Sequence, residues 1–117
     1  MSLFLSGKAN IHLLSDLTDM RKGVNGLFVL VSDLLKQNQS HTNMFVFRGK
    51  RSDKIKILYW DGQGFCIFYK RLERGKFIWP KGPSESIISI TEAQLSMLLE
   101  GIDWRFPVWS SPPEYAS

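Results

Sequence analysis

The sequence holds very few of the residues that form covalent cross-links and metal sites. Its 117 residues include a single cysteine, Cys66, and two histidines, His12 and His41. A single cysteine excludes an intrachain disulfide and the multi-cysteine zinc sites. Apolar neighbours flank Cys66 in the sequence, which favours a buried structural thiol. His12 stands in an apolar segment and His41 in a polar one, so we expect no metal site and no cofactor.

Long apolar runs are also missing. No segment approaches the roughly 18 apolar residues of a membrane-spanning helix, and the N-terminus lacks the charged start of a signal peptide. The composition is otherwise ordinary, with 44% hydrophobic and 22% charged residues, and this balance excludes wholesale disorder. We therefore expect a soluble, cytoplasmic protein that binds no membrane.

Positive charge is in excess, and it is concentrated in one part of the chain. There are 15 Lys and Arg against 11 Asp and Glu, which gives a net charge of +4 and a pI near 9.4. Residues 48–76 hold nine of the basic residues and three acidic ones, so this segment has a net charge of +6. Such a concentration attracts polyanions, but lysines on a solvated sheet edge also serve to block aggregation. The basic segment could therefore bind nucleic acid or form a solvated sheet edge, and both interpretations stay open.

The spacing of apolar residues predicts an α+β fold in a single domain over residues 10–106. Residues 1–9 would form an N-terminal segment, part of which could derive from an expression vector, and residues 107–117 a loose tail. Candidate strands are residues 10–14, 44–48, 54–60, 65–71, 76–79 and 85–90. We expect a mainly antiparallel sheet of about four to five strands with two helices.

The two helices are expected on opposite sides of the strand-rich segment in the sequence. Apolar residues recur at steps of three and four from Met20 to about Gln37, with Thr18 or Asp19 as the N-cap. Residues 91–94, Thr-Glu-Ala-Gln, fit a capping box that opens a second helix to about residue 100. Gly101 would end that second helix.

The predicted hairpin of residues 54–71 has two different faces, because side chains alternate along a strand. The nearly all-apolar face, which should pack on the helices, carries Ile55, Ile57, Tyr59, Cys66, Phe68 and Lys70. The other face carries Lys54, Lys56, Leu58, Trp60, Phe65, Ile67, Tyr69 and Arg71. Its cations could grip phosphates while Tyr69 stacks on a base. Alternatively, Leu58, Trp60 and Phe65 lie under the second helix or in a dimer interface.

Two other segments are candidates for holding a phosphate. The turn from Arg48 to Lys54 carries three cations within its first four residues, and guanidinium groups with backbone amides bind phosphate well. Arg21 and Lys22 would lie in the first turn of the first helix, whose open amides attract a phosphate or a partner carboxylate. The alternatives are an exposed hairpin tip and an exposed first turn. The complete nucleic-acid-binding set is Arg48, Lys50, Arg51, Lys54, Lys56, Tyr69, Lys70, Arg71 and Arg74.

A catalytic site is not expected. Asp53, Asp61 and Glu73 could be read as the metal ligands of a nuclease. A simpler interpretation assigns Asp61 and Asp53 to turns, where Asp is common, and pairs Glu73 with its arginine neighbours. No set of nucleophile, base and orienting group is indicated by the spacing.

The order and spacing of several short motifs resemble a known family over roughly residues 10–105. The motifs are Thr18-Asp-Met-Arg-Lys-Gly23 with Gly26-Leu27, Phe45-Val-Phe-Arg48 with Arg51, Asp53-Lys-Ile-Lys56, Trp60-Asp-x-x-Gly64, Lys70-Arg-Leu-Glu73 with Gly75 and Phe77, Trp79-Pro80, and Leu99-Glu-Gly-Ile-Asp-Trp104. Together they resemble the small Orf2-like (TnpB-type) accessory protein of insertion-sequence-66 transposable elements. Two departures are Asn25, where Asp is expected, and Lys50, where Arg is common.

The resemblance implies a bacterial accessory protein of transposition that has no catalytic residues of its own. Elements of this kind encode a separate, larger transposase with a DDE-type core. The expected partners are DNA, either at element ends or non-specifically, the large transposase, and the other accessory protein. A nucleoid-associated location follows, and a homo-oligomer and RNA binding stay open. The alternative is an assembly module whose aromatic face docks on the large transposase without contacting DNA.

Overall fold

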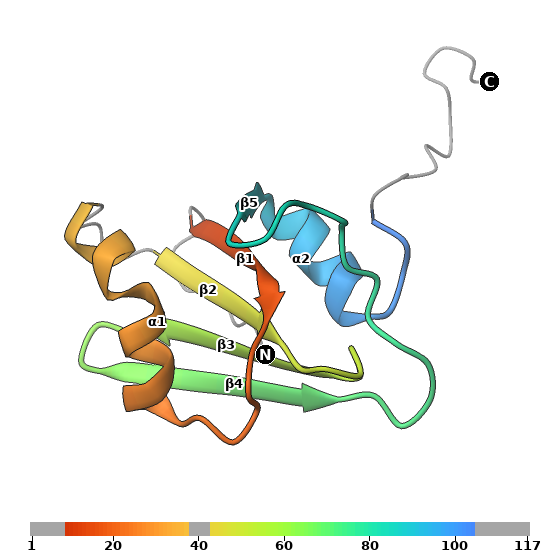
Figure 1. Cartoon of the computed structure of the whole chain (residues 1–117), viewed down its shortest axis with the longest axis horizontal. Coiled ribbons are helices and arrows are strands. Elements are labelled where there is room, and N and C mark those ends of the chain that lie inside the picture. The colour runs from red at the N-terminus through yellow and green to blue at the C-terminus, as the bar shows by residue number, and fades with distance from the viewer. Residues whose placement is uncertain (1–8, 38–42, 105–117) are drawn as a thin grey trace, which may run out of the picture.

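Five strands and two helices make up the described part of the chain, residues 9–37 and 43–104 of the computed structural model (Figure 1). The elements are β1 (Asn10–Leu17), α1 (Val24–Gln37), β2 (Asn43–Arg48), β3 (Lys54–Trp60), β4 (Phe65–Arg71), β5 (Ile87–Ile90) and α2 (Glu92–Leu99). His41 and the expected tail lie outside the described residues. Neither helix is long and apolar enough to cross a membrane.

The strands form one mixed sheet in the order β4-β3-β2-β1-β5. Only β1 and β2 are parallel, and α1 provides the crossover that a parallel pair requires. The other three neighbouring pairs are antiparallel. The prediction of an α+β fold with a mainly antiparallel sheet and two helices is confirmed.

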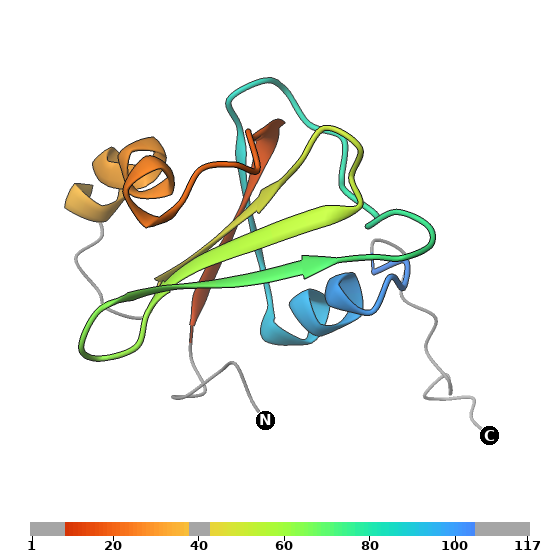
Figure 2. The ribbon, with the colours of Figure 1, turned by 90° about the horizontal axis from the view of Figure 1, so that it is seen from below.

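The two helices cover opposite faces of the sheet, as the view from below shows (Figure 2). Leu27 and Val31 of α1 pack on Phe45 and Phe47 of β2, and all four side chains are buried. On the other face, α2 and the segment around Trp79 cover the apolar residues of the central strands. Apolar side chains therefore point to both faces of β2, which explains its continuous run of buried residues.

The chain between β1 and α1 differs from the prediction. β1 continues to Leu17, where we expected a connector, because the amide of Thr18 still donates to the carbonyl of Arg48 on β2 at 2.9 Å. α1 begins at Val24 rather than at Met20, so neither Thr18 nor Asp19 is its N-cap. A bond with a strand distant in sequence thus determines where β1 ends, and the local capping signal was misleading.

The segment from Lys76 to Trp79 was also predicted wrongly, because it is not a strand. Instead, it is held to the core by individual contacts. The amide of Phe77 donates to the carbonyl of Ser52 at 2.7 Å, and Nε1 of Trp79 donates to the carbonyl of Leu14 at 3.2 Å. Both aromatic side chains are buried, so this segment closes the α2 side of the core.

The second helix begins as the sequence predicted. Thr91 Oγ1 accepts from the amide of Gln94 at 3.0 Å, and Oε1 of Gln94 accepts from the amide of Thr91 at 2.9 Å. This reciprocal pair is a capping box. After α2, Gly101 has a φ of 77°, a left-handed conformation that favours glycine.

Candidate nucleic-acid interface

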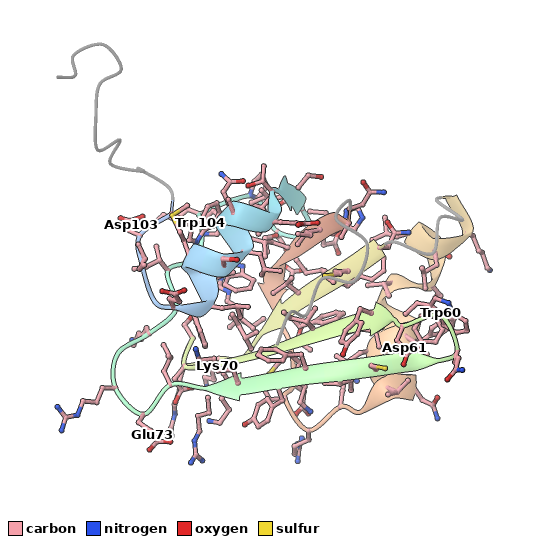
Figure 3. All side chains as sticks on the ribbon, turned by 180° about the vertical axis from the view of Figure 1, so that it is seen from behind. Trp60, Asp61, Lys70, Glu73, Asp103 and Trp104 are labelled. Carbon is pink, nitrogen blue, oxygen red and sulfur yellow. The ribbon has the colours of Figure 1, made fainter. Side chains whose placement is uncertain are left out.

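The β3–β4 hairpin has the two faces that strand alternation predicted. Its register pairs Lys54 with Arg71 and Lys56 with Tyr69, and four loop residues separate Trp60 from Phe65. Because the loop has an even number of residues, the side chains of both strands sort onto the two faces as expected. The face that carries Lys56 and Tyr69 is basic at one end of the hairpin and apolar at the loop end. Figure 3 shows the loop end at Trp60 and the other end near Glu73.

The apolar end of this face is covered by the first helix. Leu58 is fully buried against α1, and the rings of Phe28 and Phe65 meet edge to face with centroids 5.2 Å apart. The alternative that Leu58, Trp60 and Phe65 lie under the second helix is wrong, and so is the expectation that both helices pack on the other face of the hairpin. The crossover between β1 and β2 decides this, because it places α1 on the face that carries these side chains.

At the basic end, three segments distant in sequence surround an open hollow of about 550 Å³. They are the residues after β1, the turn between β2 and β3, and one aromatic residue of β4. The charged and aromatic lining comprises Asp19, Arg21, Lys50, Arg51, Asp53, Lys54 and Tyr69. We call this site the basic hollow. It joins the Arg21 motif to the hairpin and turn candidates.

The basic hollow has a net positive charge, although two of its cations are paired. Arg21 donates to the carboxylate of Asp19 at 2.8 Å, and Lys54 Nζ lies 3.6 Å from an oxygen of Asp53. The hydrogen bonds from Arg21 hold the pKa of Asp19 well below its usual range. Lys50 and Arg51 are exposed and make no ion pair with the part of the chain that the structure describes. These two cations are therefore available to an anionic ligand.

An aromatic ring is available next to these cations. Tyr69 is 49% exposed, although it lies in the middle of a strand ladder. The ammonium of Lys56 lies 5.4 Å from the centre of the Tyr69 ring and donates to the carbonyl of Lys22 at 2.9 Å. Lys56 is thus held between the ring and the chain before α1. It orients the ring and adds a positive charge beside it.

The turn between β2 and β3 is held by its own backbone. The amide of Gly49 donates to Lys54 and the amide of Ser52 donates to Gly49, with Ser52 in a left-handed conformation at a φ of 58°. Both amides are occupied, so neither is open to the phosphate that we expected the turn amides to bind. A phosphate at this turn would therefore meet the exposed Lys50 and Arg51 rather than these two amides.

Arg48 and Lys70 lie outside the basic hollow. The guanidinium of Arg48 donates to Ser52 Oγ at 3.1 Å and to the carbonyl of Ser15 at 3.2 Å, and it lies 5.4 Å from the centre of the Trp79 ring. Burial lowers the pKa of Arg48. Lys70, labelled in Figure 3, donates to the carbonyl of Leu99 at the end of α2 at 2.6 Å. Both cations therefore make contacts within the protein.

The remaining predicted cations do not line the basic hollow. Arg71, beside Lys54 in the ladder, is exposed and pairs with Glu73 at 3.3 Å. Arg74 is exposed in the following turn. Lys22 lies before α1 and not in its first turn, so the predicted phosphate site on the first-turn amides was placed wrongly.

The acidic residues do not converge. Asp61 accepts from the amides of Gln63 and Gly64 in the hairpin loop, and Glu73 is at the opposite end of the hairpin (Figure 3). Within residues 9–37 and 43–104, no three or more His, Cys, Asp or Glu side chains form a group suited to a metal ion. Cys66 is half-buried rather than buried, because its position faces the loop, where its thiol donates to Asp61 at 3.3 Å. This bond raises the pKa of Cys66.

The comparison with known families matches the whole of the described part of the chain. A family model described as "IS66 Orf2 like protein" matches residues 9–108. The chain belongs to the IS66 Orf2-like family. This places it among the accessory proteins of insertion-sequence transposition and confirms the resemblance seen in the sequence motifs.

Two relatives from Sinorhizobium fredii are similar to this IS66 Orf2-like chain over about three quarters of its length. Uncharacterized protein y4hO is 50% identical over 90 residues, which cover 77% of each chain. Uncharacterized protein y4jC is 40% identical over 86 residues, or 74% of this chain and 73% of its own. No solved structure matches the chain.

Proposed function

We propose that this IS66 Orf2-like protein is a non-catalytic accessory factor that binds DNA, mainly by phosphate contacts made in the basic hollow. The observation that supports this function is the convergence of Arg21, Lys50, Arg51 and Lys54 around an exposed tyrosine. These cations come from two segments that are nearly 30 residues apart in the sequence. Folding thus brings separate charges together at one open surface.

Phosphate contacts explain the chemistry of the hollow better than base readout does. Lys50 and Arg51 extend from an exposed turn, and guanidinium and ammonium groups are the usual partners of phosphate oxygens. Among the described residues, no helix lines the hollow, and its two unpaired cations, Lys50 and Arg51, stand in a turn rather than on an element that could enter a major groove. We therefore expect binding to duplexes of any sequence, with any preference for element ends coming from DNA shape.

The test is a titration of the full chain with an element-end duplex and a scrambled duplex at several salt concentrations. Fluorescence anisotropy should give an affinity for both duplexes that falls steeply with salt, since each phosphate contact contributes a slope of about −0.9 on logarithmic axes. The double variant Lys50→Glu/Arg51→Glu should bind at least tenfold more weakly and reduce the slope by about 2.

The matched control is Lys36→Glu/Lys81→Glu, which changes the net charge by the same amount at two exposed lysines outside the hollow. It should retain most of the affinity. Equal losses in the two double variants would show that net charge alone attracts DNA. No binding to either duplex at low salt would overturn the proposal and favour the assembly module.

A further inference from the structure

A second depression lies next to the basic hollow, and its lining has the opposite character. It is a groove of about 310 Å³ between α1 and the β1–β5 edge of the sheet. Its apolar lining consists of Leu14, Leu17, Leu30, Leu34 and Ile87. We call it the apolar groove. Thr18 borders both the groove and the basic hollow, so the two sites are neighbours.

The apolar groove concentrates the exposed apolar surface of the molecule. Leu17 is 53% exposed, Leu30 47% and Ile87 39%. They are half of the six large hydrophobic side chains that are exposed within the described ranges, and Val29 precedes Leu30 on α1. Contiguous apolar surface that remains open to water is typical of an interaction site.

The fold leaves this surface open for a geometric reason. α1 buries Leu27 and Val31 against β2 and β3, so the helix lies toward the β4 side of the sheet. Leu30 and Leu34, one helical turn apart, form a second apolar stripe along α1. On the sheet, Ile87 pairs with Leu14 at the uncovered edge. The stripe and the edge strand therefore face each other without a covering element in the described part of the chain.

The charged residues of the groove are acidic, although the chain as a whole is basic. Asp16 and Glu85 line the groove, and none of the described Lys or Arg residues does. Asp16 is fixed there, because its carboxylate accepts from Ser84 Oγ at 3.2 Å and from the amide of Glu85 at 3.0 Å. Asp33 is exposed one helical turn after Leu30. This arrangement repels phosphate and attracts cations.

We propose that the apolar groove binds a cationic amphipathic segment of a partner protein. Apolar side chains of that segment would cover Leu17, Leu30 and Ile87, and its Lys or Arg side chains would pair with Asp16 and Glu85. A nucleic acid does not fit, because the described lining of the groove offers its phosphates no cation. A second copy fits poorly, because a two-fold pairing of groove against groove would bring the Asp16 and Glu85 carboxylates of both copies together.

The test uses three synthetic peptides of equal length and the full chain. The first places leucine along one helical face and lysine on the other, the second scrambles this order, and the third replaces lysine with glutamate. Anisotropy of the labelled peptides should show binding of the first only. In an amide spectrum of the unmodified protein, that peptide should shift signals of Leu17, Leu30 and Ile87 and not those of the basic hollow.

Variants on exposed positions then test the groove itself. Leu30→Ser/Ile87→Ser should bind the leucine–lysine peptide at least tenfold more weakly, since two apolar contacts are lost. Ile102→Ser removes a similarly exposed apolar side chain elsewhere and should have no effect. Glu85→Asn removes a charge but suits the left-handed backbone at this residue, φ 64°, so it should weaken binding without unfolding the protein.

Four results with the peptides and the variants would overturn the proposal. They are no binding of the leucine–lysine peptide, equal binding of the glutamate peptide, equal weakening by Ile102→Ser, and spectral shifts confined to surfaces other than the groove. Light scattering that shows a dimer, converted to a monomer by Leu30→Ser/Ile87→Ser, would also overturn it. In that case the occupant would be a second copy of the chain.

Discussion

Individual basic residues of this protein have different tasks, even where they are neighbours in the sequence. Arg48 joins β1, the β2–β3 turn and the Trp79 segment through two hydrogen bonds and a ring contact. Lys50, two residues later, is exposed at the basic hollow. A half-buried guanidinium that satisfies carbonyl and hydroxyl groups is structural, and only the exposed cations are available to DNA. Charge counting along the sequence cannot make this distinction.

Asp19 is predicted to weaken DNA binding, because it neutralises Arg21 at the basic hollow. Asp19→Asn should therefore raise the affinity for duplex DNA roughly two- to fivefold at low salt. The asparagine oxygen can still accept the amide of Arg21, a bond of 2.9 Å in the structure, so the local turn should survive. Anisotropy titrations of the variant and the unmodified chain would measure this difference, and unchanged affinity would show that Arg21 does not contact DNA.

The pH dependence of DNA binding follows from the ionisation of the Asp19 carboxylate. The Arg21 bonds lower the pKa of Asp19 in the folded protein. A group with a lowered folded pKa contributes stability that is present above its unfolded pKa and is lost as the pH falls through its folded pKa. Lowering the pH from 7 to 5 should therefore leave Asp19 ionised and should not reproduce the gain in affinity of Asp19→Asn.

At the level of elements, the basic hollow depends on close contact between the chain after β1 and the β2–β3 turn. A Cβ atom at Gly49 would lie 2.7 Å from Cγ of Met20. This distance is shorter than a van der Waals contact, and the atom is in the middle of the side chain, so the segment would have to move. Glycine at this position therefore lets Arg21 approach Lys50 and Arg51.

Gly49→Ala is predicted to destabilise the protein and to weaken DNA binding together. Overpacking of this kind costs about 1–3 kcal/mol, which urea denaturation would measure as a lower midpoint. Gly64→Ala is the matched control, because a Cβ atom there meets nothing within 4 Å and the residue needs no left-handed backbone. If the two variants were equally stable, the contact with Met20 would not be important.

Elements controlled by local signals could be predicted from the sequence, and elements controlled by distant contacts could not. The hairpin strands β3 and β4 were predicted with their observed bounds, and the Thr91 capping box is present. The extension of β1 depends on pairing with Arg48. The segment around Trp79 is not a strand and is held to the core by a side-chain bond to the carbonyl of Leu14. These partners lie about 30 and 65 residues away, beyond the range of any local pattern.

The candidate site shows the same limit. Lys54 and Tyr69 were placed on one face by alternation alone, and the register agrees. Sequence alternation could not show that Arg21 lies beside them, because this depends on how the crossover between β1 and β2 is placed. Asp19 was not predicted as a site residue, although it is two residues from Arg21 and pairs with it. Arg48 could have been separated from the hollow by parity, since it shares the α2 face of β2 with Met44 and Val46.

For the whole molecule, the main feature is that two unlike surfaces meet at Thr18. The basic hollow attracts polyanions, and the acidic, apolar groove repels them. An accessory protein with this arrangement could hold DNA and a partner protein at the same time. Apart from Thr18 the two sites use different side chains, so each can be altered at residues that do not line the other.

The last prediction is that the two sites act independently. Lys50→Glu/Arg51→Glu should lose DNA binding and keep its affinity for the leucine–lysine peptide, whereas Leu30→Ser/Ile87→Ser should do the reverse. Effects at separate sites without shared partners usually add within about 0.3–0.5 kcal/mol. The variant that carries all four substitutions should therefore show, for each ligand, a loss of binding free energy equal to the sum of the losses of the two double variants. Titrations of each variant with each ligand, in separate samples because DNA itself binds cationic peptides, would measure this. A coupling beyond that range would mean that the Thr18 segment moves when either site is occupied, and the two surfaces would then form one functional unit.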